Sequence, residues 1–150
     1  MARRLGADVV LAPEEATAAR FRELSEGRGV DVAYEASSTP AALQQAVDAV
    51  ARQGLVVAVS WYGARPVTLN LGGAFHRGRL RLASSQVGAL DPALSPRWDH
   101  ARRSRVVCDL LPALHLAELI SHRFPLERAA EVYRLIDERP EETVQVVFQY

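Results

Sequence analysis

The chain has 150 residues, of which 49% are hydrophobic and 24% charged, so it is long and apolar enough to build a globular core. Its 18 lysines and arginines balance 18 aspartates and glutamates, which excludes a global field that would draw the chain to nucleic acid or to an anionic membrane. No apolar stretch could span a bilayer, and no long apolar region follows the basic start as in a secretory signal. We therefore expect a cytoplasmic protein, with neither nucleic acid nor membrane as a partner.

The first part of the chain alternates short apolar runs with helical patterns. The expected elements are a strand at Val9–Leu11, a helix starting at Pro13 and stopped by Gly27 and Gly29, a strand at Val30–Ala36, a helix from Pro40 stopped at Gly54, and a strand at Leu55–Val59. Strands that alternate with helices predict an α/β fold with a Rossmann-like, doubly wound parallel sheet. Ligands bind beyond the carboxyl ends of such strands, which places Ala36-Ser37-Ser38 and Ser60-Trp61-Tyr62 at the candidate site.

The remainder of the chain has a different, α+β character. The expected elements are strands at Val67–Leu71 and Arg79–Leu82, a loop at Gly88–Pro96, a helix from Ser95-Pro96 to about Pro112, a strand at Leu119–Phe124, a helix at Pro125–Asp137 and a strand at Thr143–Tyr150. The helix before Pro140 carries one apolar stripe, made of Ala129, Val132, Tyr133 and Ile136.

The sequence contains no pattern typical of a metal site or of a catalytic nucleophile. The single cysteine, Cys108, excludes an internal disulfide and a cysteine-rich zinc site, and we interpret it as a small buried hydrophobic residue. No metal-site spacing relates the four histidines, so we predict no zinc in this chain. Ser84-Ser85 lacks the G-x-S-x-G context of a hydrolase nucleophile, and we expect Glu35 to make a structural hydrogen bond rather than to transfer a proton.

Several runs together resemble the C-terminal part of the medium-chain, zinc-type alcohol dehydrogenases. They are Leu5–Asp8, Gly29–Ser37, Pro40–Leu43, Gly54–Val57, Phe75-His76, Ser84–Gly88, His122–Leu126 and Ala130–Ile136. The resemblance covers nearly the whole chain and implies hydride transfer between NAD or NADP and a small-molecule alcohol or carbonyl. It also implies that residues 1–85 are the C-terminal portion of the cofactor-binding domain and that residues 86–150 complete the catalytic, GroES-like domain.

The resemblance also assigns cofactor-binding residues. It places Ala36, Ser37 and Ser38 on the adenosine side, Val59, Ser60 and Trp61 in the next cofactor loop, and the backbone of Ser84, Ser85 and Gln86 at the nicotinamide carboxamide. Within this resemblance, the runs Ser84–Gly88 and Arg97–Arg103 are similar to a subgroup that includes relatives of bacteriochlorophyllide dehydrogenases.

The chain departs from the family pattern at several functional positions. The family usually has glycine where Ser38 and Ser60 stand, and Gln145 takes the place of a basic residue that reaches the pyrophosphate in some members. No G-x-G-x-x-G loop is present, and the family's zinc ligands belong to an N-terminal domain. We therefore assign no catalytic residue and expect the isolated chain to be inactive.

The strand order of the Rossmann fold suggests two alternative roles. In the order 3-2-1-4-5-6 this chain would keep strand 3 and strands 4 to 6 and lack the two between them, which leaves the strand Val32–Ala36 with an open apolar edge. One alternative is a non-enzymatic interaction module that pairs through this edge, as a homo-oligomer or with a separately encoded N-terminal half. The other is a truncated or mis-started gene product, suggested by the abrupt start at Met1.

Overall fold

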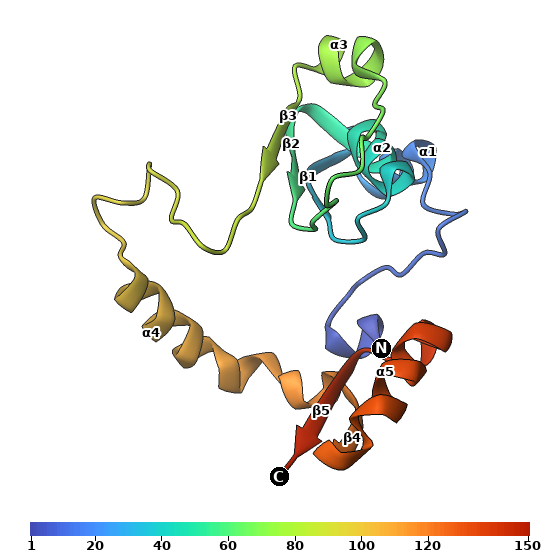
Figure 1. Cartoon of the computed structure of the whole chain (residues 1–150). Helices are drawn as coiled ribbons and strands as arrows, with labels where there is room; N and C mark the ends of the chain where they lie inside the picture. Colours follow the sequence, from blue (N-terminus) through green and yellow to red (C-terminus); the bar gives the residue numbers. More distant parts are fainter. The chain divides into compact units, whose positions relative to one another are not determined.

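The computed structural model describes all 150 residues, which form two compact units, Met1–Ala89 and Leu90–Tyr150 (Figure 1). Each unit contains its own parallel sheet. No helix is both long and apolar enough to cross a bilayer. The expected assignment of residues 1–85 and 86–150 to parts of a cofactor-binding and a catalytic domain stays a prediction.

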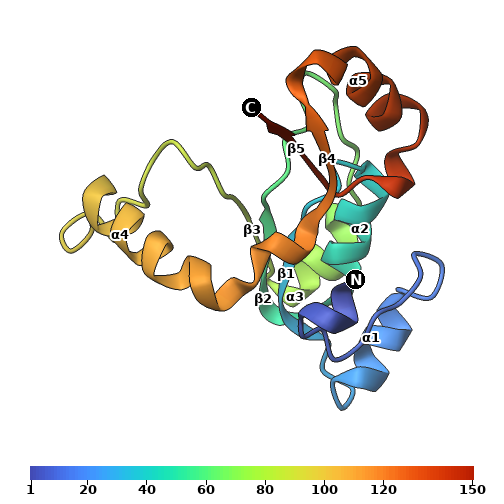
Figure 2. The same ribbon diagram turned by 90° about the horizontal axis from the view of Figure 1, so that it is seen from below.

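A three-stranded parallel sheet forms the centre of the first unit, with its strands side by side in Figure 2. Its order is β1 (Val30–Glu35), β2 (Val50–Ala58) and β3 (Arg81–Ser84). The expected pairing of the first two is confirmed, with Val32 opposite Leu55 and the register running on to the carboxyl ends. The α/β class with parallel strands is therefore confirmed.

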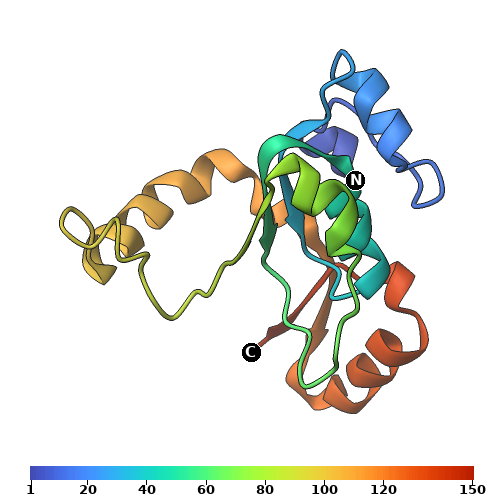
Figure 3. The ribbon, with the colours of Figure 1, turned by 90° about the horizontal axis from the view of Figure 1, so that it is seen from above.

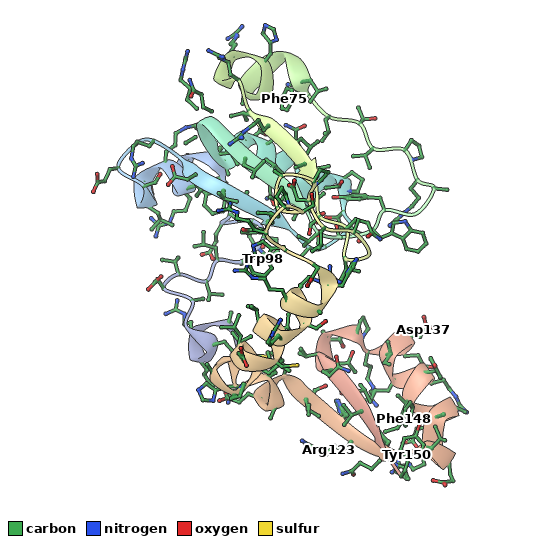
Figure 4. All side chains as sticks on the ribbon, turned by 90° about the vertical axis from the view of Figure 1, so that its left-hand side faces the viewer. Phe75, Trp98, Arg123, Asp137, Phe148 and Tyr150 are labelled. Carbon is green, nitrogen blue, oxygen red and sulfur yellow. The ribbon has the colours of Figure 1, made fainter.

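Helix α2 (Pro40–Ala49) covers one face of this sheet (Figure 1). It begins where the sequence predicts, because the Thr39 hydroxyl accepts a hydrogen bond from the Ala42 N–H at 3.3 Å. Its Val47 packs with Val56 of β2, and both side chains are 0% exposed. Phe75, labelled in Figure 4, packs against the same core from the irregular helical turn η2 (Leu71–Phe75), which leads into the short α3 (His76–Gly78).

The sheet has no gap between its strands, which corrects the expected topology. Val9–Leu11 forms no strand, because it lies against no backbone ladder that could take its N–H and C=O groups, and Val9 and Val10 are more than 40% exposed. β1 is nevertheless an edge strand, as expected. The first helix also starts late: α1 (Ala18–Leu24) begins after Thr17, whose hydroxyl accepts from the Arg20 N–H.

Two further expectations in this unit were wrong, and a third was displaced along the chain. Gly54 does not stop a helix, because α2 ends at Ala49 and β2 has begun by Val50. Residues 67–70 form no strand: their apolar alternation is real, since Val67 and Leu69 pack on the core, but the segment makes no ladder. The strand expected at Arg79–Leu82 is displaced by two residues, to β3.

The second unit pairs β4 (Ile120–Pro125) with β5 (Gln145–Gln149) in parallel and places α5 (Ala129–Glu138) beside β4 (Figure 3). The sequence predicts all three elements, although α5 begins at Ala129 rather than at Pro125 and β5 at Gln145 rather than at Thr143. The short turns η1 (Ala2–Leu5), η3 (Leu111–Leu114), η4 (Leu116–Leu119), η5 (Leu126–Arg128) and η6 (Pro140–Glu142) complete the two units.

Burial in the second unit departs from the expected pattern. Helix α4 (His100–Leu110) starts later than expected, capped by Asp99, and buries no residue, so Cys108 is exposed rather than buried. In α5 the buried side chains are Val132 and Leu135, whereas Tyr133 is 71% exposed. A sheet of only two strands covers too little of the helix to bury the whole apolar stripe.

Candidate functional site

A buried carboxylate organises the carboxyl ends of β1 and β2. Glu35, the last residue of β1, is 3% exposed and is the only buried charged side chain. Its Oε1 accepts hydrogen bonds from the Ser37 N–H at 2.6 Å, from the Ser37 hydroxyl at 2.7 Å and from the Ser38 N–H at 3.0 Å. The carboxylate therefore fixes the loop that follows its own strand.

The second carboxylate oxygen reaches the neighbouring loop. Oε2 of Glu35 accepts hydrogen bonds from the Ser60 hydroxyl and, at 2.6 Å, from the Tyr62 hydroxyl, both of which follow β2. The backbone carbonyl of Glu35 also accepts from the Val59 N–H at 2.9 Å. Glu35 thus links the loop after β1 to the loop after β2, the two loops that the sequence places at the site. The expectation that Glu35 makes structural hydrogen bonds is confirmed.

The network moves the pKa of both titrating partners. Burial raises the pKa of the Glu35 carboxyl, but the hydrogen bonds from Ser60, Tyr62 and Ser37 stabilise the charged form more strongly and bring the pKa down to about 2. Burial raises the pKa of the Tyr62 phenol, and the hydrogen bond that it donates to Glu35 raises that pKa further. Glu35 is accordingly an anion, and Tyr62 a neutral donor, at neutral pH.

A cleft of about 530 Å³ opens beside this network at the carboxyl ends of β2 and β3. A hydrogen bond of 2.9 Å from the Ser85 N–H to the Ala58 carbonyl holds its two sides together. Apolar side chains flank it and are well exposed: Val59 at 44%, Trp61 at 86% and Val87 at 80%. The cleft is therefore accessible and offers both an aromatic face and main-chain polar groups.

The structure gathers six of the nine predicted cofactor-binding residues around this cleft. They are Val59, Ser60, Trp61, Ser84, Ser85 and Gln86. Ala36, Ser37 and Ser38 lie outside its lining, on the loop that Glu35 links to Ser60. Tyr62, which the strand order also placed at the candidate site, lines the cleft as well, and so does Val87, which was not predicted. The signal that could have identified the network is an acidic residue ending one parallel strand and hydroxyls following the next.

The two positions where the family usually has glycine differ in backbone conformation. Ser38 has a φ of 60°, in the left-handed region that glycine adopts most easily. Ser60 is not among the residues with positive φ, and its side chain contributes a hydrogen bond to Glu35. The backbone of Ser38 is thus strained, whereas the Ser60 side chain helps to hold the Glu35 carboxylate.

Several solved structures share the fold of this chain. An oxidoreductase of unknown specificity from Escherichia coli matches with a TM-score of 0.79 at 17% identity, over 99% of this chain and 40% of that chain. An Escherichia coli alcohol dehydrogenase solved with NADH matches with a TM-score of 0.75 at 18% identity, over 99% and 40%. The alcohol dehydrogenase of Thermus sp. ATN1 matches with a TM-score of 0.73 at 25% identity, over 97% and 38%.

These structures are much longer than the present chain, which spans about 40% of their length. A comparison with curated proteins finds no match. A family model described as zinc-binding dehydrogenase matches residues 1–101, which includes the whole sheet of the first unit and the cleft. The chain therefore belongs to the zinc-binding dehydrogenase family.

Proposed function

We propose that this chain provides the C-terminal part of the cofactor-binding face of a nicotinamide-dependent dehydrogenase acting on an alcohol or carbonyl group. The observation that carries the proposal is the cleft at the carboxyl ends of β2 and β3, because open parallel sheets bind dinucleotides at that edge. The solved relative that holds NADH supports the choice of cofactor. The runs Ser84–Gly88 and Arg97–Arg103 support the bacteriochlorophyllide dehydrogenase-like subgroup as a finer proposal.

The cleft residues fit the uncharged parts of such a cofactor. Trp61 offers a flat aromatic surface to a ring, while the N–H and C=O groups around Ser84 and Gln86 suit a carboxamide. When bound, the nicotinamide ring would supply the hydride acceptor or donor. The residues of this chain would bind and orient that ring and keep water from one side of it.

The residues of this chain do not fit two other sites of the family, the diphosphate loop and the zinc site. No G-x-G-x-x-G loop is present to hold a diphosphate. No group of three or more His, Cys, Asp or Glu side chains is placed to bind a metal ion, and Cys108 stands alone and exposed. We predict that the isolated chain does not turn over.

A fluorescence titration with NADH tests the cofactor proposal. Trp98→Phe leaves Trp61 as the only tryptophan, and Trp61→Phe leaves Trp98, which stacks under Arg102 in the second unit. We expect saturable quenching of Trp61 and none of Trp98. An unresponsive Trp61, or equal quenching of both tryptophans, would contradict the proposal.

An activity assay tests the predicted lack of turnover. The full chain is incubated with NAD or NADP and a series of simple alcohols, and formation of reduced cofactor is followed by absorbance. We expect no reduction above the protein-free control. Appreciable reduction with any of the alcohols would refute the prediction.

The open edge of β1 favours a second function, that of an interaction module. Val32 and Tyr34 on this strand are 43% and 72% exposed, and a cavity of about 260 Å³ beside it is lined mostly by apolar residues, from α2, β1 and the segment that includes α1. An edge of this kind can pair with a second copy or with a separate N-terminal half. Light scattering after size exclusion tests self-pairing: we expect a dimer that Val32→Lys dissociates, whereas a monomer at all concentrations would count against it.

A further inference from the structure

The donors around Glu35 form the kind of pocket that usually receives an external anion. Two consecutive main-chain N–H groups, from Ser37 and Ser38, point at one carboxylate oxygen. The hydroxyls of Ser60 and Tyr62 point at the other. Proteins use such converging N–H and O–H groups to bind phosphates and carboxylates, yet here the anion belongs to the chain itself.

Because Glu35 occupies the pocket, it limits which hydrogen-bond donors of these loops are free to bind a ligand. Because all these donors already serve Glu35, none of them remains for a phosphate group. A phosphate close to either loop would also meet the negative charge of the carboxylate without intervening bulk water. Uncharged rings and riboses face no such repulsion, and the adjoining cleft presents Val59 and Trp61 to them.

Building on the proposed function, we infer that Glu35 is a positioning residue that acts as a built-in anion. It holds the loops after β1 and β2 in one arrangement and restricts them to the uncharged nucleoside portion of a dinucleotide. The diphosphate of the dinucleotide must then be bound by residues outside these two loops.

Chemical rescue tests the built-in anion directly. Glu35→Ala removes the part of the side chain that acetate resembles, so acetate can refill the pocket, while the uncharged acetamide has the same shape. In ¹⁵N-labelled full chain we expect the Ser37 and Ser38 amide resonances to move in the variant and to return toward their wild-type positions with acetate and not with acetamide. Equal effects of acetate and acetamide would overturn the inference.

Titration of the unmodified chain with inorganic phosphate tests the exclusion. We expect the Ser37 and Ser38 amide resonances to stay in place. A saturable shift of either would overturn the inference.

If Glu35→Ala does not fold, Glu35→Gln takes its place in the rescue experiment. The loss of charge should move the Ser37 and Ser38 amide resonances upfield, whereas Glu14→Gln, at an exposed acid, should not. Unchanged resonances in Glu35→Gln would also overturn the inference.

Cofactor binding separates this inference from the function on which it rests. We expect Glu35→Ala to weaken NADH binding at Trp61 roughly tenfold, and acetate to restore it. Val47→Ala, which loosens the same core away from the loops, should leave NADH affinity unchanged. If acetate rescues the amide resonances but the wild type binds no NADH, the cofactor proposal fails and the built-in anion stands. If NADH binds Glu35→Ala as well as wild type, the positioning role fails alone.

Discussion

The hydroxyl of Tyr62 donates a 2.6 Å hydrogen bond to Oε2 of Glu35, across 27 residues of sequence. The bond crosses from the loop after β2 to the end of β1, so it joins two neighbouring strands at their carboxyl ends. Since the acceptor is charged and buried, the bond is stronger than one between neutral groups in water. The stability of the first unit and the shape of its cleft are thereby coupled through one carboxylate.

Acid should destabilise the first unit through Glu35. Its folded pKa of about 2 lies below the ordinary value of 4.5, so its stabilising contribution is fully present above about pH 4.5 and is lost as the pH falls toward about 2. The difference corresponds to roughly 2–4 kcal/mol. Urea unfolding at about pH 7 and about pH 3 measures the part of this loss that occurs above pH 3, roughly 2 kcal/mol, and Glu35→Gln should show a smaller decrease. A decrease of the same size in Glu35→Gln would show that other groups are responsible.

Tyr62→Phe should destabilise the first unit by about 1–2 kcal/mol, because Oε2 of Glu35 keeps the Ser60 hydroxyl but loses its second donor. The pKa of Glu35 should rise at the same time. Urea unfolding measures the first effect and carboxyl NMR titration the second. Tyr133→Phe is the matched control: that side chain is 71% exposed, and its change should stay within about 0.5 kcal/mol. Equal effects of the two substitutions would contradict the prediction.

Gly29 should tolerate no side chain. Its φ is +91°, and a Cβ there would lie 2.7 Å from the Ala49 carbonyl oxygen at the end of α2. Gly27 has a similar φ of +85° but open space around it. Thermal unfolding should therefore show a loss of about 1 kcal/mol for Gly27→Ala, from conformation alone, and of roughly 3 kcal/mol or more for Gly29→Ala. Similar losses would mean that the close approach to Ala49 is unimportant.

Leu135→Ala should destabilise the second unit by about 2–4 kcal/mol, because Leu135 is only 8% exposed in α5. Tyr133→Ala, on the exposed side of the same helix, should cost less than about 1 kcal/mol, mostly through helix propensity. Circular dichroism during urea unfolding compares the two variants. A larger loss of stability in Tyr133→Ala than in Leu135→Ala would mean that Tyr133 is buried, as part of the apolar stripe that the sequence predicts.

The sequence by itself determined the elements whose signals are local. The Thr39-Pro40 start of α2, the apolar run of β2 and the pattern of α5 each act within one segment, so propensity and capping suffice to predict them. The parallel pairing of β1 with β2 followed from the helix between them. The same order of strands placed Ser37 and Ser60 at one edge.

Only the tertiary structure decided which apolar segments became strands and which side chains became buried. Val9–Leu11 and Val67–Leu71 have strand-like patterns but no neighbour that completes a ladder, and Cys108 lies on a helix that no layer covers. The Glu35 network depends on the lateral spacing of two strands far apart in sequence. Strand pairing, burial and buried charge all depend on a partner in space, which no local pattern of residues specifies.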